Sequence, residues 1–211
     1  MLKIKICGIT NVADALLASE EGADFIGLIF APSSRQVDIN VAKEVVSEMP
    51  EGVVPVGVFQ DQPAEEVRNI LTTCGIRFAQ LHGNESVDYA ASLGAHVIKA
   101  FDTYTDQTLE SLRTYDTYAS LLDIPKGNLG RSSVDVHWAT CAKKYGRVIL
   151  AGGLTPDRVR DLVRRVRPYG VDVCSFIERS PGKKDRSKLH DFVQAAREAE
   201  QRTTSFRVNI R

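Results

Sequence analysis

The stretch Lys3-Ile4-Lys5-Ile6-Cys7-Gly8-Ile9-Thr10 contains the first strand pattern of the chain, and a helix pattern follows it directly. The apolar run ends at Cys7. A side chain at the carboxyl end of a buried parallel strand faces the mouth of an α/β barrel or sheet, where such folds carry out their chemistry. The position of Cys7 therefore predicts a functional thiol, acting as a base or a nucleophile. A buried structural cysteine is the alternative.

Strand and helix patterns alternate along the whole chain. Short apolar runs without polar alternation predict further strands that are buried on both faces, at 24–30, 54–59, 78–81, 96–100, 119–123, 148–151 and 171–175. Amphipathic segments lie between them, for example 11–21, 63–73, 155–166 and 187–200. Eight strand–helix units in 211 residues come to about 26 residues each, which is within reach of a (β/α)8 barrel.

We therefore predict the α/β class, with one (β/α)8 TIM-barrel domain over residues 1–211 and a possible C-terminal tail at 201–211. The main alternative is an open doubly wound sheet. Its dinucleotide-binding version carries Gly-x-Gly-x-x-Gly after the first strand, and this chain has Cys-Gly-Ile-Thr there.

Composition excludes several classes of partner. Lys and Arg together number 27, as do Asp and Glu, so no basic excess favours nucleic acid or an anionic membrane. No apolar run has the length of a signal peptide or a membrane span, and we expect a cytoplasmic protein. The four cysteines lie far apart without a Cys-x-x-Cys pair, so neither a zinc site nor a disulfide framework is predicted.

Asp123 ends the sixth predicted strand, so it faces the same barrel mouth as Cys7. A turn or helix cap is the alternative, because a loop with Pro125 and Gly127 follows. An acid on strand six and a base on strand one lie on opposite sides of the mouth, with room for a sugar-sized substrate between them. The two residues together predict acid–base chemistry.

The ends of strands seven and eight predict a phosphate site. Gly152 and Gly153 let the backbone approach a ligand closely, and the helix that starts after Thr155 offers free N–H groups. Ser175 ends strand eight, and the loops after strands seven and eight commonly bind phosphate in such barrels. A simple tight turn is the alternative for the glycine pair.

Three other polar residues near strand ends have weaker interpretations. Arg35, after strand two, either forks onto a carboxylate or phosphate or is a solvated loop residue. His82 is interpreted first as a hydrogen-bonded residue that holds its loop, and Asp172 as a residue paired inside the barrel.

Seven motifs in order resemble the phosphoribosylanthranilate isomerase family. They are Lys5-Ile6-Cys7-Gly8-Ile9-Thr10, the segment 27–35 (Gly-Leu-Ile-Phe-Ala-Pro-Ser-Ser-Arg), Val56-Gly57-Val58-Phe59, Gln80-Leu81-His82-Gly83, Leu121-Leu122-Asp123, Ala151-Gly152-Gly153-Leu154 and Pro181-Gly182-Lys183-Lys184-Asp185. The resemblance covers nearly the whole chain. It implies a (β/α)8 barrel that uses no metal and no organic cofactor.

The resemblance also implies the reaction, an Amadori rearrangement in tryptophan biosynthesis. N-(5-phosphoribosyl)anthranilate, the small phosphorylated substrate, becomes 1-(2-carboxyphenylamino)-1-deoxyribulose 5-phosphate. By resemblance Asp123 is the general acid, Cys7 the general base, and Arg35 the partner of the anthranilate carboxylate. Backbone amides after strands six to eight hold the phosphate, which assigns Gly130, Gly152, Gly153 and Ser175 to substrate binding. We expect a monomer or a homodimer.

Two departures from the family pattern fall at the expected phosphate site. The family usually ends strand eight with Ser-Ser-Gly-Val-Glu, where this chain has Cys174-Ser175-Phe176-Ile177-Glu178, and the loop at 127–138 is altered. Two alternatives therefore stay open. One is a related sugar-phosphate isomerase of the same barrel type, and the other is a non-catalytic barrel that acts as an interaction subunit.

Overall fold

The structure is a computed structural model, and it describes residues 1–101, 106–123 and 132–208. At 106–107, 132–135 and 203–208 only the backbone is described. Gly130, which the family resemblance assigns to phosphate binding, lies outside the described residues, as do residues 209–211 of the expected tail.

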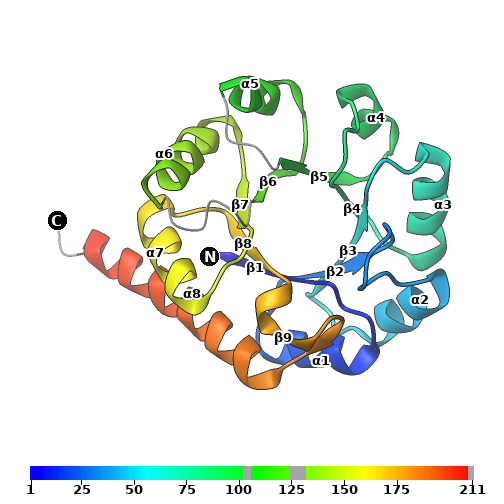
Figure 1. The fold of residues 1–211 in the computed structure, drawn as a ribbon, viewed down its shortest axis with the longest axis horizontal. Helices are drawn as coiled ribbons and strands as arrows, with labels where there is room; N and C mark the ends of the chain where they lie inside the picture. Colours follow the sequence, from blue (N-terminus) through cyan, green and yellow to red (C-terminus); the bar gives the residue numbers. More distant parts are fainter. Residues whose placement is uncertain (102–105, 124–131, 209–211) are drawn as a thin grey trace.

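Eight parallel strands form a closed barrel in which each strand pairs with its neighbours in sequence and β8 pairs with β1 (Figure 1). The strands are β1 (Lys3–Cys7), β2 (Phe25–Ile29), β3 (Val54–Phe59), β4 (Phe78–Leu81), β5 (His96–Phe101), β6 (Ala119–Asp123), β7 (Val148–Ala151) and β8 (Gly170–Val173). The (β/α)8 prediction is confirmed. The predicted ends of β8 were wrong, because the chain turns at Cys174 into a 3₁₀ turn, η3 (Ser175–Ile177).

Helices surround the barrel on its outside (Figure 1). They are α1 (Val12–Glu20), α2 (Ile39–Glu48), α3 (Ala64–Cys74), α4 (Val87–Ser92), α5 (Asp106–Thr114), α6 (Ser132–Ala142), α7 (Pro156–Val166) and α8 (Arg186–Val208), with the short 3₁₀ turn η2 (Lys143–Tyr145) after α6. Asn11 and Thr155 cap α1 and α7 through their side chains, as helix N-caps do. Helix α8 continues to Val208, so helix extends into the stretch for which the sequence showed no pattern.

Strand residues alternate between two apolar layers. Inside the barrel, an apolar cluster is formed by Phe25, Val56, Ile98, Ala100, Ala119, Leu121, Ile149 and Ala151. A larger layer lies between strands and helices and includes Ile4, Ile6, Leu122, Trp138 and Phe192. Because side chains fill the barrel, a substrate has access only at an end.

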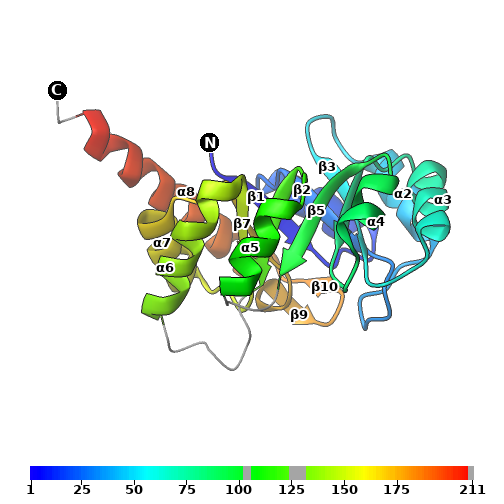
Figure 2. The same cartoon turned by 90° about the horizontal axis from the view of Figure 1, so that it is seen from above.

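The carboxyl ends of the strands point toward the small antiparallel pair β9 (Glu178–Ser180) and β10 (Lys183–Lys184), and the N-terminus lies on the opposite side (Figure 2). In the same view, the last part of α8 extends beyond the barrel. Among the residues described, no helix has both the length and the apolar character to cross a membrane.

Candidate active site

Cys7 ends β1 and is almost completely buried. Its neighbour on β2 is Gly27. The Cys7 sulfur lies 2.7 Å from the point where a Cβ at residue 27 would stand, so the glycine provides the space for the thiol. Gly8 then turns the chain with φ of +71°, a conformation that favours glycine. Cys7 thus stands at the carboxyl end of its strand, as the sequence predicted, but its buried side chain is not among those that line the cavity at this end of the barrel.

The surroundings of Cys7 favour its thiolate. A hydrogen bond from the Cys174 thiol lowers the pKa of Cys7 well below its ordinary value, against the effect of burial, and the charges of Lys5 and Lys184 lower it further. The same hydrogen bond, with burial, raises the pKa of Cys174. Of the two thiols, Cys174 therefore keeps its proton and Cys7 is the group that ionises.

Asp172 lies inside the barrel beside this thiol pair. Its Oδ1 accepts a hydrogen bond of 2.8 Å from Nζ of Lys5, and both side chains are buried. The interpretation of Asp172 as a paired interior residue is confirmed. Burial raises the pKa of Asp172 to about 6, and the charge of Lys5 opposes that rise. Its hydrogen bond with the Lys5 ammonium favours the ionised carboxylate.

Asp123 ends β6 across the mouth from Cys7, and its carboxylate lies beside His82, which follows β4. His82 Nε2 is 3.5 Å from Asp123 Oδ2, and its Nδ1 is 3.3 Å from Nε2 of Gln80. The hydrogen bond with Asp123 raises the pKa of His82. His82 is a hydrogen-bonded residue, as predicted, but one of its contacts is the candidate acid, which the sequence analysis missed.

Arg35 forms a bidentate pair with Glu178 at the start of β9. Its Nε donates to Oε1 at 2.8 Å and its Nη2 donates to Oε2 at 2.6 Å. Glu178 also accepts from Lys184 Nζ at 3.0 Å and from the Gly182 N–H at 3.2 Å. Arg35 is therefore not a solvated loop residue, and its guanidinium is held in one orientation by a partner that sequence analysis did not identify.

A cavity of about 180 Å³ opens at this end of the barrel. Its lining brings together most of the predicted site, with Arg35, Asp123, Gly152, Gly153 and Ser175, and it also contains Asp172, Cys174 and Phe176. Phe176 is half-buried and packs against the outer apolar layer while it lines the cavity. Helix α7 begins with its first turn directly after this glycine segment, so its free N–H groups are close to the cavity wall.

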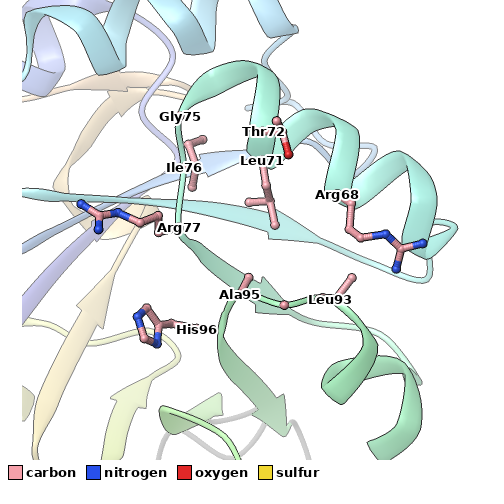
Figure 3. A pocket seen from close by; sticks show the side chains of 10 residues that line it. Arg68, Leu71, Thr72, Gly75, Ile76, Arg77, Leu93, Ala95 and His96 are labelled. Atoms are coloured by element: carbon pink, nitrogen blue, oxygen red, sulfur yellow. The ribbon is translucent and has the colours of Figure 1, made fainter.

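A second cavity, of about 650 Å³, lies at the amino ends of β4 and β5, between α3 and α4 (Figure 3). Arg68, Arg77 and His96 are its ionisable lining residues. Arg68 donates to the Ser92 carbonyl, and His96 stacks on Phe78. No lining residue of this cavity is an acid or a thiol. The acid–base pair therefore places the candidate active site at the carboxyl ends of the strands.

A (β/α)8 barrel with an ionisable thiol and a carboxylic acid on opposite sides of its mouth, beside a glycine-rich segment and an arginine, defines a class. It is the class of sugar-phosphate isomerases that work by proton transfer. Known proteins narrow this class to one family.

The family model for N-(5'-phosphoribosyl)anthranilate isomerase matches residues 4–195. A relative of that name from Geobacter sp. is 42% identical over 201 residues, which cover 93% of this chain and 98% of the relative. The crystal structure of phosphoribosylanthranilate isomerase from Thermotoga maritima superposes with a TM-score of 0.85 at 34% identity, covering 94% of this chain and 100% of that one.

A further solved structure is similar to this chain with a TM-score of 0.80 at 32% identity, covering 94% of this chain and 100% of the other. It is a phosphoribosylanthranilate isomerase in complex with reduced 1-(o-carboxyphenylamino)-1-deoxyribulose 5-phosphate. The chain belongs to the phosphoribosylanthranilate isomerase family and is an aldose–ketose isomerase of tryptophan biosynthesis.

Proposed function

We propose that Cys7 is the general base and Asp123 the general acid of the rearrangement of N-(5-phosphoribosyl)anthranilate. Asp123 protonates the ribose ring oxygen, and the ring opens to a protonated Schiff base. The cationic nitrogen makes the proton on sugar C2 acidic. Cys7 removes that proton, and the resulting enolamine tautomerises to the aminoketose. The observation that supports this assignment is that a thiolate-forming Cys7 ends β1 and Asp123 ends β6, at the carboxyl ends of the same barrel.

Each group suits its task physically. A base must be ionised before it takes a proton, and the Cys174 hydrogen bond with the neighbouring ammonium charges favours the Cys7 thiolate. An acid must be resupplied with a proton, and His82 is the neighbour that does this for Asp123, because the contact between them raises the pKa of His82. The side chains of His82 and Asp123 are both about one-third exposed, which leaves space for substrate beside the acid.

Substrate binding follows the charges of the cavity. Arg35 binds the anthranilate carboxylate through donors that its pairing with Glu178 leaves over, since Glu178 occupies Nε and one Nη2 proton. The backbone at Gly152, Gly153 and Ser175 binds the phosphate beside the first turn of α7. Gly130 is proposed for the same role from the family resemblance alone.

One solved structure similar to this chain contains monomers derived from the dimeric isomerase of Thermotoga maritima. We accordingly infer a monomer or a homodimer for this chain. From the sequence and the family resemblance we also infer that it acts in the cytoplasm on a small phosphorylated substrate. We infer no nucleic-acid or membrane partner, and no metal or organic cofactor.

The assignment of the base is tested with substrate generated in situ, following the loss of its anthranilate-like fluorescence. Cys7→Ser should lower turnover at least about 100-fold, because it removes a proton-transfer group. Cys141→Ser, at a partly exposed thiol on α6, is the matched control and should keep wild-type turnover. A Cys7→Ser protein with near-wild-type turnover would falsify the assigned role, and an inactive wild type would favour a non-catalytic barrel.

A further inference from the structure

Two lysines are buried in the strands of this barrel, and their environments differ. Lys99 on β5 has its Nζ surrounded by acceptors, with hydrogen bonds to Glu85 at 3.1 Å and to the Gly83 carbonyl at 2.7 Å. These hydrogen bonds fix the loop after β4. Lys5 on β1 is the more deeply buried of the two, and its ammonium donates to Asp172 at 2.8 Å and lies beside the sulfur of Cys7 where β2 carries Gly27. It is the buried cation that faces a reactive group.

The strand geometry brings Lys5 and Cys7 together. Residues two apart on a strand point to the same face, so both side chains enter the barrel interior from β1. A Cβ at Gly27 on β2 would lie 2.7 Å from the Cys7 sulfur and 3.0 Å from Lys5 Nζ. The space left by the missing side chain of Gly27 is therefore shared by the thiol and the ammonium.

We propose that Lys5 is a positioning residue for the isomerisation, whose ammonium, oriented by Asp172, holds Cys7 as a thiolate before substrate binds. The proposal rests on the proposed role of Cys7 as the base. A buried thiolate without a nearby cation is strongly disfavoured, because burial penalises an unpaired charge. Lys5 stays protonated throughout; the proton from sugar C2 goes to the Cys7 sulfur and converts the thiolate to the thiol.

The protonation states in the barrel agree with this assignment. Burial opposes the ammonium form of Lys5, but the charges of Asp172 and Cys7 outweigh burial and raise the pKa of Lys5. Lys5 is thus the cation of the three groups, and its ammonium interacts with both Asp172 and Cys7. Removing the Asp172 charge should therefore stabilise the Cys7 thiolate, and removing Lys5 should destabilise it.

Other ionisable groups interact with Cys7 from the elements around it, namely Cys174 after β8, Lys184 on β10, Arg35 after β2 and His82 after β4. Two carboxylates pair with these groups, Asp123 on β6 with His82 and Glu178 on β9 with Arg35 and Lys184. Lys184 is the competing cation, but its Nζ points to the Cys7 carbonyl at 2.7 Å and to Glu178 at 3.0 Å. Its charge is directed to the backbone and a carboxylate away from the sulfur, whereas Lys5 Nζ, besides its pair with Asp172, lies beside the Cys7 sulfur at Gly27.

The test measures the thiolate directly and needs no substrate. The full-length protein is treated with iodoacetamide across a pH series, and modification of the Cys7 peptide is followed by mass spectrometry, which separates it from the other three cysteines. Lys5→Met should slow alkylation of Cys7 at neutral pH at least about tenfold, as expected when the pKa of the Cys7 thiol rises by about one unit. Lys99→Met, which also breaks a buried ion pair, is the matched control and should leave the profile unchanged.

Asp172→Asn separates an electrostatic role from a structural one. It breaks the same ion pair as Lys5→Met but keeps the Lys5 ammonium, which then interacts with Cys7 without a competing carboxylate. Alkylation of Cys7 in mildly acidic solution should therefore become faster. Opposite shifts in the two variants support the proposal. Slower alkylation in both, or an unchanged profile in Lys5→Met, overturns it, and if Lys5→Met does not fold, a slower or unchanged Asp172→Asn overturns it. None of these outcomes depends on activity, so a failure of the general-base assignment is seen separately in Cys7→Ser.

Discussion

The two sides of the barrel mouth are built in different ways. On the base side, Cys7 is 5% exposed and Lys5 is 1% exposed, and Asp172 completes a buried set of charges. On the acid side, the side chains of His82 and Asp123 are 34% and 35% exposed and are 3.5 Å apart. The base is therefore surrounded by fixed interior charges, whereas the acid side is open to solvent and to a bound substrate.

The acid side is tested by the variant with the largest expected effect, Asp123→Asn. The amide keeps the shape of the side chain but has no acidic proton to transfer, so turnover should fall at least about 100-fold. Because Asp123 is half-exposed at the barrel mouth, the thermal midpoint should stay close to that of wild type. His82→Asn is the comparison, because it removes the neighbour but leaves the acid, and its turnover should stay well above that of Asp123→Asn. Equal losses in the two variants would contradict Asp123 as the proton donor.

The close packing of the base side predicts a second, smaller effect. In Gly27→Ala the new methyl group would meet the Cys7 sulfur at 2.7 Å, so the thiol or the lysine must move. We expect turnover to fall about tenfold and stability to fall by about 1–3 kcal/mol, as for other overpacked cores.

Gly57→Ala on β3 is the matched control for Gly27→Ala. Its Cβ would meet the ring of Phe59 at the same 2.7 Å, in the layer between barrel and helices rather than at Cys7. It should lose similar stability, measured by denaturant unfolding, but keep its turnover. If both variants lost turnover equally, the effect would come from general overpacking and not from the base side.

The same contrast explains what the sequence could predict. The fold and the pair Cys7 and Asp123 were predictable because strand periodicity and strand ends are local features, and parallel strands bring their ends to one edge. Boundaries failed at the end of β8, where Cys174 turns the chain into a 3₁₀ turn that no local pattern indicates.

The partners of the site residues were not predictable in the same way. Glu178 pairs with Arg35 across 143 positions of sequence, and Lys5 pairs with Asp172 across 167. Which charges meet depends on barrel closure and on the register of β1 against β8, both of which are properties of the whole sheet. One local signal was available, since a charged residue two positions before a strand-end cysteine shares its face.

The next effect concerns Arg35, which lies between the two sides. Arg35→Lys should weaken binding of the reduced carboxyphenylamino-deoxyribulose phosphate analogue about tenfold, because an ammonium lacks the planar fork that Glu178 orients. Calorimetry with this analogue and with the same compound lacking its carboxylate gives the measurement. Wild type should prefer the carboxylate form, and the variant should lose most of that preference. Arg113→Lys, in an exposed pair with Glu110, is the control and should bind as wild type does. If Arg35→Lys kept the wild-type preference for the carboxylate form, Arg35 would not be the residue that binds the substrate carboxylate.

The smallest expected effect is a stability difference on the acid side, and it has a defined sign with pH. The hydrogen bond with Asp123 raises the pKa of His82, so folding favours the charged imidazole. Its contribution is fully present below the ordinary histidine pKa of about 6.5 and is lost as pH rises through the raised value. Both groups are about one-third exposed and screened by solvent, so the contribution should not exceed about 1 kcal/mol. Denaturant unfolding of wild type and His82→Asn should therefore differ at about pH 5.5 and coincide at about pH 8.5. A difference that is larger in alkaline solution would show that His82 is held in its neutral form, and the relay of a proton from His82 to Asp123 would then have no basis.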